Sequence, residues 1–501
     1  MLARLLDLPL LVITIGIAGA AMYLPAIHAL VLRDYPVGRA FFYSGTLVLV
    51  LTGLIGLALA NRSARNVARS HFAALIGAYL VLPPILSLPF AEAVRDASRL
   101  DAWFEMVSAF TTTGASLYAP EALPAPVHLW RALCGWFGGL FVLIGAATIL
   151  APMNLGGFEL LAEPAQRQPG VDQPDPAERL RGYALRVAPA YGGITVALWI
   201  VLVIAGEAPF VALCHAMGAV STSGISPVGG VEGGAAAGWS EGAIALVCAL
   251  ALTRRSLPGA VRIDPDAPLW RDPELRLAAA IIGGVSVLLF ARHALGALWG
   301  EGDAGGPAEA LAALWGMIFT TVSFLTTTGY VSAGWTGASA WSGVEAPVMV
   351  LLGLAIIGGG VATTAGGVRL LRVHALGRMG ARELDRLSHP SAVGRGDEAR
   401  QARRAPLAFV VFMLFALALG TSCAALALTG LDFDRSVVLA VAALATAGQL
   451  ADLAQPEAGG FAALGAAGKA VAAGTMIAGR LETLAILAVL MPGGWSRWGR
   501  R

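Results

Sequence analysis

Charge is what this sequence has least of. Of its 501 residues, 34 are Lys or Arg and 32 are Asp or Glu, so charged residues make up 13% of the chain against 57% hydrophobic residues. Soluble domains carry about 25% charged residues, and a soluble fold of this length needs a charged surface that this composition cannot supply. The sequence therefore predicts a polytopic membrane protein.

Cysteine, histidine and catalytic motifs are also scarce. The four cysteines, Cys134, Cys214, Cys248 and Cys423, lie apart in the sequence without a CxxC pair, and the seven histidines are scattered. This pattern is typical of small buried side chains rather than metal ligands. No GxSxG or HExxH motif occurs, and Gly468-Lys469 lacks the other residues of a phosphate-binding loop. We expect that this chain is not an enzyme, holds no cofactor and binds no nucleic acid.

Ten apolar stretches are long enough to cross about 30 Å of hydrocarbon as helices. They cover roughly residues 8–32, 40–60, 70–90, 129–151, 183–205, 236–253, 277–299, 344–371, 405–429 and 466–491. The lipid bilayer is therefore the expected surroundings of most of the chain.

The arginines predict the orientation of these spans. They gather in loops 61–69, 254–276 and 369–404 and at the C-terminus, whereas segments 206–241 and 300–343 contain no Lys or Arg. By the positive-inside rule, both termini and the arginine-rich loops are expected in the cytoplasm. Segments 160–182 and 373–403, rich in Pro, Gln, Asp and Arg, are predicted to be solvated cytoplasmic loops.

A tetrapeptide of small residues ending in Gly occurs four times, each time after an apolar stretch of about 10–18 residues. The copies are Thr111-Thr112-Thr113-Gly114, Ser221-Thr222-Ser223-Gly224, Thr326-Thr327-Thr328-Gly329 and Ala445-Thr446-Ala447-Gly448. Their glycines are 110, 105 and 119 residues apart. Each repeat is predicted as a helix, a half-length re-entrant helix, a Gly-ended loop and a second helix. Non-helical backbone at membrane depth must be buried or line water, so we expect the four loops to line one pore.

The repeated tetrapeptide has the composition of a cation filter. Backbone carbonyl oxygens can replace the hydration shell of a cation without a buried anionic charge, and Gly permits the positive φ that such a loop needs. Thr and Ser add hydroxyl oxygens, and the half-helices direct their partially negative C-terminal ends at the centre. A single copy would be read as a helix C-cap, but four copies in phase with the spans favour the filter.

These loops resemble the filters of the TrkH/KtrB superfamily of potassium-translocating transmembrane subunits, and TrkH most of all. The resemblance rests on residues 104–116, on His215-Ala216-Met217 with the second tetrapeptide, and on residues 326–330, and it covers essentially the whole chain. It implies that carbonyl groups of Thr112, Thr113, Gly114, Thr222, Ser223, Gly224, Thr327, Thr328 and Gly329 bind potassium. Thr446, Ala447 and Gly448 complete the predicted filter. They continue into Gln449-Leu450, where the family usually has an Asn-Val-Gly-Pro-Gly-like run, which leaves selectivity for potassium over sodium open.

The eighth span contains an unusual number of glycines. Each Gly costs about 1 kcal/mol in a helix relative to Ala, so the helix is expected to break there, although close packing of small residues against another helix is an alternative. The run resembles the family's intramembrane gating loop, with Arg369 at its basic position and differences at Gly360, Ala362 and Ala365. The gate residues implied are Gly358, Gly359, Gly360, Thr363, Thr364, Gly366 and Gly367.

Arg480 is the basic residue that topology does not explain. It lies about 17 Å from the cytoplasmic end of the last predicted span, near mid-membrane, where a charge costs about 2.5–3.5 kcal/mol and usually faces water or a partner. Glu482 is two residues away and points elsewhere on the helix. The run 479–482 resembles a family signature beside the gating loop. Arg480 is expected to repel cations or pin the closed loop; a structural ion pair away from the pore is the alternative.

The predicted fold is an all-α polytopic membrane protein with four helix–pore-loop–helix repeats around one pseudo-fourfold pore, preceded by two extra transmembrane helices. The expected parts are an N-terminal helix pair (1–66), pore repeat 1 (67–160), pore repeat 2 (180–258), pore repeat 3 with the gating loop (272–372), a cytoplasmic linker (373–403) and pore repeat 4 (404–492).

The predicted function is the ion-conducting subunit of a bacterial potassium uptake system in the inner membrane, with potassium as its substrate. The resemblance implies a homodimer and a separate cytosolic nucleotide-binding ring of the TrkA/KtrA kind. Three alternatives stay open: the same fold passing sodium or both ions, a coupled secondary transporter, and a membrane enzyme. The second would more typically show inverted repeats, and the third lacks clustered acids, bases or metal ligands.

Overall fold

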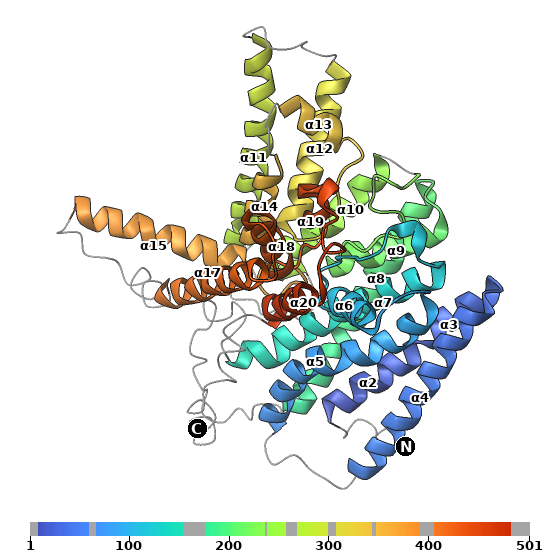
Figure 1. Ribbon diagram of the computed structural model, residues 1–501. Helices are drawn as coiled ribbons and strands as arrows, with labels where there is room; N and C mark the ends of the chain where they lie inside the picture. Colours follow the sequence, from blue (N-terminus) through green and yellow to red (C-terminus); the bar gives the residue numbers. More distant parts are fainter. Residues whose placement is uncertain are drawn as a thin grey trace, which may run out of the picture.

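The fold consists of helices and the loops between them (Figure 1). The computed structural model describes residues 9–59, 67–153, 176–235, 238–256, 268–298, 307–342, 347–389 and 405–481, and no strand occurs among them. Eight helices in this part of the chain are long and apolar enough to cross a membrane. The prediction of an all-α polytopic membrane protein is confirmed.

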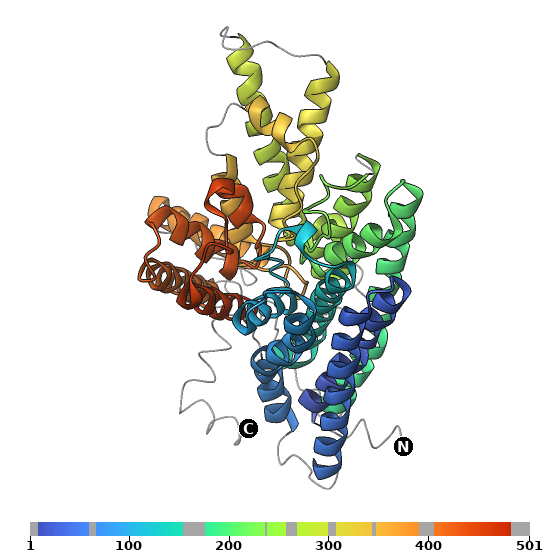
Figure 2. The same ribbon diagram turned by 45° about the vertical axis from the view of Figure 1, so that its right-hand side comes forward.

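The N-terminal pair lies at one side of the molecule (blue in Figures 1 and 2). The first predicted span is two helices, α2 (Leu10–Ala21) and α3 (Tyr23–Val31), and both pack on α4 (Tyr35–Leu59). Pro25 has no N–H to donate to the preceding turn, which explains the break. A Cβ at Gly45 would lie 3.0 Å from the Gly19 carbonyl oxygen, so these two glycines let α2 and α4 approach closely.

Four repeats follow, and each has a shorter helix or a re-entrant helix between two others. Repeat 1 comprises α5 (Val67–Ala93), α6 (Arg99–Phe110) and α7 (Ala125–Gly145). Repeat 2 comprises α8 (Pro176–Ile204), α9 (Pro209–Ser221) and α10 (Trp239–Ala249). Repeat 3 comprises α11 (Pro273–Leu298), α12 (Pro307–Leu325), α13 (Trp335–Ser342) and α14 (Pro347–Ile357). Repeat 4 comprises α17 (Ala405–Ala427), α18 (Phe433–Leu444), α19 (Leu450–Ala454) and α20 (Ala466–Leu481).

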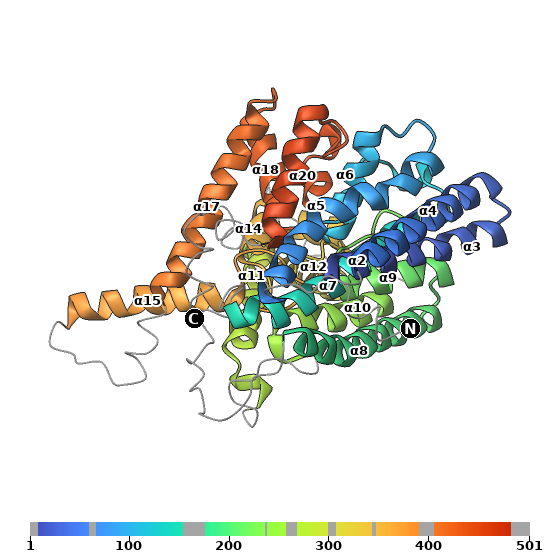
Figure 3. The ribbon, with the colours of Figure 1, turned by 90° about the horizontal axis from the view of Figure 1, so that it is seen from below.

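The four repeats close into a ring, which Figure 3 shows from below. Helix α7 packs on α9, α10 on α12, α14 on α18, and α20 on α6. Repeat 4 therefore contacts repeat 1, as a pseudo-fourfold arrangement requires. The C-terminal ends of α6, α9, α12 and α18 all lead directly into the predicted filter loops.

One re-entrant helix is longer than the sequence predicts, and the glycine-rich eighth span is interrupted as the sequence predicts. Helix α12 has 19 residues, so the third re-entrant helix is longer than half a bilayer. The eighth predicted span is helical only over α14, unwinds over residues 358–369, and continues as α15 (Leu370–Ser388), which projects from the body (Figure 1).

The prediction of a loop over residues 373–403 is wrong for its described part, because residues 373–388 belong to α15. Leu370 and Leu371 at its start are buried, whereas Leu384 and Leu387 near its end are exposed. The Pro and Gln residues of this segment, Pro390 and Gln401, both come after residue 389. Likewise α8 begins at Pro176, within the loop predicted over residues 160–182. Residues 154–175, 390–404 and 482–501, including Glu482, lie outside the described part of the chain.

Candidate ion filter and gate

The second residue of every tetrapeptide has the same strained backbone. Thr112, Thr222, Thr327 and Thr446 have φ values of +55°, +53°, +56° and +55°. A positive φ is rare for a β-branched residue and persists only where the surroundings enforce it. The same turn is therefore built four times, once in each repeat, at positions far apart in the sequence.

Backbone hydrogen bonds fix this turn against the end of each re-entrant helix. In repeat 1, the N–H groups of Thr113 and Gly114 both donate to the Ser108 carbonyl oxygen, at 2.9 and 3.3 Å. The third and fourth residues of the second and third tetrapeptides donate in the same way to Gly218 and Ser323. These bonds satisfy carbonyl groups that a helix end would otherwise leave free.

Hydroxyl groups repeat in the same three loops. The Oγ1 atoms of Thr111 and Thr113 are 2.8 Å apart, and the corresponding pairs Ser221–Ser223 and Thr326–Thr328 are each 2.9 Å apart. All six side chains are buried. These contacts tie the first residue of each tetrapeptide to the third and add rigidity to the turn.

The fourth loop departs from the other three. Alanines at positions 445 and 447 replace the paired hydroxyl residues. The N–H of Gly448 donates to the Thr113 carbonyl oxygen of the neighbouring repeat 1 at 2.7 Å, instead of back to its own helix. Gly114, Gly224 and Gly329 have positive φ values, whereas Gly448 is not in that region.

The filter glycines bring neighbouring loops into contact. A Cβ at Gly114 would overlap the Ser223 carbonyl, and a Cβ at Gly224 would overlap the Thr328 carbonyl. Only Gly permits such an approach of one backbone to another. The structure therefore brings the twelve residues of the predicted filter together around one centre.

Residues 358–369, which we call the gating loop, lie against the inner residues of this filter. The N–H of Gly366 donates to Thr327 Oγ1 at 2.8 Å, and a Cβ at Gly366 would overlap the Ala445 carbonyl and Thr446 Oγ1. Thr364 Oγ1 is 3.5 Å from the carbonyl oxygen of Val220. The gating loop thus contacts the filter ends of repeats 2, 3 and 4.

Two buried arginines hold the carbonyl groups of the gating loop. Arg480 on α20 is 5% exposed and donates from Nη1 to the Thr364 oxygen at 2.6 Å. Arg369 Nη1 donates to the Gly360 oxygen at 2.9 Å. Among the described residues, no carboxylate forms an ion pair with Arg480. Its observed contact is thus with the loop itself.

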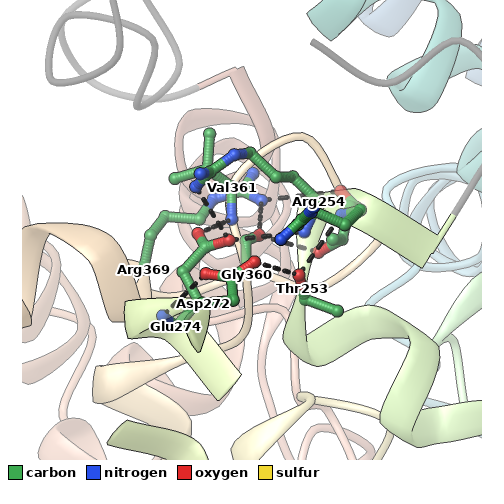
Figure 4. Close-up of polar contacts among 9 residues, drawn as sticks. Thr253, Arg254, Asp272, Glu274, Gly360, Val361 and Arg369 are labelled. Atoms are coloured by element: carbon green, nitrogen blue, oxygen red, sulfur yellow. Dashed lines mark hydrogen bonds and ion pairs between the residues drawn. The ribbon is translucent and has the colours of Figure 1, made fainter. Parts of the chain in front are cut away.

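A buried polar network on the other side of the gating loop was not foreseen from the sequence (Figure 4). Glu274 at the start of α11 accepts the Val361 N–H at 2.8 Å and lies 3.2 Å from Arg254 Nη1. Asp272 accepts hydrogen bonds from Thr253 Oγ1 at 2.7 Å and from the Glu274 N–H at 3.0 Å. The only sequence signal was an acidic pair beside Pro273, at the start of a helix.

Buried glutamates also hold the segments that follow two filter loops, and sequence reasoning missed this role. Glu105 lies 2.8 Å from Arg131 Nε and accepts a hydrogen bond from Ser116 Oγ at 3.0 Å. Glu241 accepts hydrogen bonds from Ser332 Oγ and, at 2.7 Å, from the Ala333 N–H. A carboxylate in an apolar re-entrant helix such as α6 was the signal available for Glu105.

Comparison with known proteins shows similarity in both sequence and structure. The sequence model of the TrkH family, described as "Cation transport protein", matches residues 305–494. The Trk system potassium uptake proteins TrkH of Salmonella typhimurium and Vibrio parahaemolyticus are each 29% identical to the chain, over 95% and 96% of its length and 96% and 97% of their own. The crystal structure of the potassium transporter TrkH from Vibrio parahaemolyticus covers 99% of this chain and is itself covered completely, with a TM-score of 0.79 and 25% identity.

The chain is therefore similar to TrkH proteins in sequence and in fold over nearly its whole length. The family match agrees with the predicted ring of pore-loop repeats and with a multi-pass membrane protein. The relatives are named as transport proteins, which agrees with the prediction that the chain is not an enzyme.

Proposed function

We propose that the chain is the ion-conducting subunit of a bacterial potassium uptake system, with potassium as its substrate. The observation that carries the proposal is the strained threonine turn that recurs in all four repeats around one centre. The names of the TrkH relatives, all of them potassium uptake proteins, support it.

The filter in this proposal consists of backbone oxygens rather than charged groups. Its members are Thr112, Thr113, Gly114, Thr222, Ser223, Gly224, Thr327, Thr328, Gly329, Thr446, Ala447 and Gly448. None of these twelve is acidic, so a cation is held by dipoles that can release it again. The turn bonds and the hydroxyl pairs keep these dipoles in place.

The gate in this proposal is the gating loop with Arg480. Its members are Gly358, Gly359, Gly360, Thr363, Thr364, Gly366, Gly367 and Arg480. The loop contacts the inner filter residues of three repeats, so an ion leaving the filter meets it directly. Arg480 pins it through the Thr364 carbonyl and adds a positive charge that opposes cations.

The proposed setting follows from charge and from the family. In this proposal the chain spans a bacterial inner membrane with both termini in the cytoplasm, an orientation that the arginine-rich segments support through the positive-inside rule. The chain forms a homodimer, and a cytosolic nucleotide-binding ring of the TrkA/KtrA kind docks on the arginine-rich side and moves the gate. The name "Trk system" of the relatives suits an assembly of several components. The pore repeats keep the boundaries 67–160, 180–258, 272–372 and 404–492.

Sodium, alone or together with potassium, is the second candidate substrate. It is favoured by the fourth loop, which lacks the hydroxyl pair and donates a hydrogen bond to Thr113 of the neighbouring repeat 1. Because the fourth loop differs from the other three, the backbone oxygens of the four loops are not held in equivalent positions. Selectivity between two monovalent cations depends on the positions and the number of their ligands.

The deciding experiment is uptake of potassium and rubidium, with sodium competition, in cells that lack their own potassium importers. The chain is expressed with the cytosolic partner of its own operon or genome. Restored growth at low potassium supports the proposal. Uptake of sodium without potassium supports the second candidate, and no uptake of either ion contradicts both.

A substitution in the filter tests the site itself. Gly114→Ser places a side chain at φ +73° against the Ser223 carbonyl and is expected to change the preference between potassium and sodium. Gly474→Ser is the control, because nothing lies within 4 Å of a Cβ at Gly474. Unchanged ion preference in Gly114→Ser would reject the filter assignment.

A further inference from the structure

Gln449, the residue after the fourth tetrapeptide, extends its side chain across the filter. A Cβ at Gly114 or at Gly224 would overlap the Gln449 amide nitrogen, and a Cβ at Gly329 would overlap the Gln449 Oε1 atom. The side chain starts in repeat 4 and touches the filter glycines of the other three repeats. A group that meets all four repeats of a ring lies at its centre, so the amide stands in the path of any ion that follows the axis.

The two ends of this amide have different surroundings. Nε2 donates to the Ser223 carbonyl oxygen at 3.0 Å, and this carbonyl belongs to the predicted ion ligands. Oε1 is buried and has no hydrogen-bond partner among the described residues. A buried oxygen without a donor is unfavourable, and a cation on the axis would satisfy it.

A cavity of about 320 Å³ lies beside this amide, and no residue of the gating loop lines it, so we call this side of the filter its outer side. Gly114, Gly224 and Gln449 line it, together with Ser116 and Asp452. An ion in this cavity therefore meets Gln449 together with the filter glycines Gly114 and Gly224.

We propose that Gln449 is a specificity-determining residue at the outer end of the filter, where its amide turns away from Ser223 and its Oε1 becomes one of the ligands of the entering cation. The inference rests on the proposed function and adds to it a ligand that is a side chain. The backbone carbonyls are fixed by the turn bonds, whereas this oxygen moves with three side-chain torsions. A mobile ligand can close on the smaller sodium ion as well as on potassium. Gln449 therefore supports affinity for both ions and lowers the discrimination between them.

Two substitutions test whether Gln449 is a ligand of the ion or an obstruction in its path. Gln449→Ala removes both bulk and amide, whereas Gln449→Met keeps the bulk and removes the polar atoms. Loss of one neutral ligand is expected to raise the KM for potassium uptake about fivefold in both variants. The inhibition constant of sodium should rise by a larger factor, because sodium depends more on the mobile ligand. Gln455→Ala, on the same outer segment but outside the cavity lining, is the matched control and should leave both constants unchanged.

A binding measurement keeps the test independent of gating and of the cytosolic partner. The purified full-length chain is heated in detergent at increasing potassium or sodium concentrations, and the rise in Tm gives an apparent Kd for each ion. Both Gln449 variants should bind potassium about fivefold more weakly than the unsubstituted chain.

The outcomes distinguish this inference from the function on which it rests. If the unsubstituted chain takes up potassium and both Gln449 variants keep its KM, its sodium inhibition and its Kd within about twofold, the inference is wrong and the function stands. If Met behaves as the unsubstituted chain and only Ala differs, Gln449 is an obstruction and not a ligand, which also overturns the inference. If the unsubstituted chain neither binds nor transports potassium or sodium, the proposed function itself fails.

Discussion

The filter and the gating loop are built on opposite principles. Every repeat contributes a tetrapeptide with the same positive-φ threonine to the filter, whereas the gating loop occurs once, between α14 and α15 of repeat 3. A dehydrated ion needs ligands on all sides, and hence a symmetric set. A passage can be obstructed by a single segment, provided that this segment is held in place. Substitutions in the filter should therefore change which ions pass, and substitutions around the gating loop should change how readily any ion passes.

The largest effect on potassium uptake is expected where two filter loops meet. Gly224→Ala forces a Cβ into a left-handed residue at φ +58° and against the Thr328 carbonyl oxygen. The strain of about 1–3 kcal/mol moves the carbonyls of repeats 2 and 3, so uptake of potassium should fall by at least about tenfold. Gly474→Ala, in open surroundings on α20, is the control. Retained uptake in Gly224→Ala would contradict the tight contact between the loops.

The next effect is expected on the stability of the protein, when the carboxylate of Glu274 that holds the gating loop is removed. Glu274→Ala leaves Arg254 buried without its carboxylate and the Val361 N–H without its acceptor. Breaking a buried pair by removal of one partner costs about 3–5 kcal/mol, which thermal unfolding in detergent measures as a lower Tm. Glu274→Gln keeps a hydrogen-bond acceptor for the Val361 N–H, so its Tm should fall less than that of Glu274→Ala. If the two variants unfold alike, the bond to the gating loop contributes nothing.

Substitution of Arg480 tests whether the gate and the filter have separate roles. Arg480→Ala removes a charged donor from the Thr364 carbonyl, a bond worth about 1.5–3 kcal/mol, so the gating loop leaves its position more readily. Potassium flux without the cytosolic partner should rise about tenfold, while the ratio of potassium to sodium uptake stays as it was. A changed ratio would show that Arg480 acts on the filter.

The smallest effect is expected from the hydroxyl pairs. Thr113→Val removes the hydroxyl contact with Thr111 but keeps shape and backbone, and the double substitution Ala445→Thr with Ala447→Thr adds a hydroxyl pair to the loop that lacks one. Each changes one neutral hydrogen bond of about 1 kcal/mol, so the ratio of potassium to sodium uptake should shift about two- to fivefold. Equal ratios in both variants and the unsubstituted chain would mean that these hydroxyl groups do not influence the filter.

The repeated filter loops and the glycine-rich unwound segment could be predicted from the sequence, whereas the contacts between distant segments could not. Four tetrapeptides in phase with the spans were enough to predict the ring, and the glycines after residue 357 were enough to predict an unwound segment. The bond from Glu274 to Val361 joins residues 87 positions apart, and the bond from Gln449 to Ser223 joins residues 226 positions apart. Such contacts depend on how the repeats pack, which composition and spacing do not contain.

The wrong loop prediction has a related cause. Pro, Gln, Asp and Arg in the pooled composition of residues 373–403 favour a loop. The leucines of α15 recur at helical spacing, and the charged residues lie between them. Periodicity within the first half of the segment was the better signal.

The most direct test of the central claim is the anomalous scattering of rubidium in crystals of the full-length chain. The account predicts a rubidium peak on the pseudo-fourfold axis, surrounded by residues 111–114, 221–224, 326–329 and 445–448, with Gln449 at its outer side. A chain that transports rubidium but shows no peak between these four loops, or binds the ion elsewhere, would contradict the assignment of the filter.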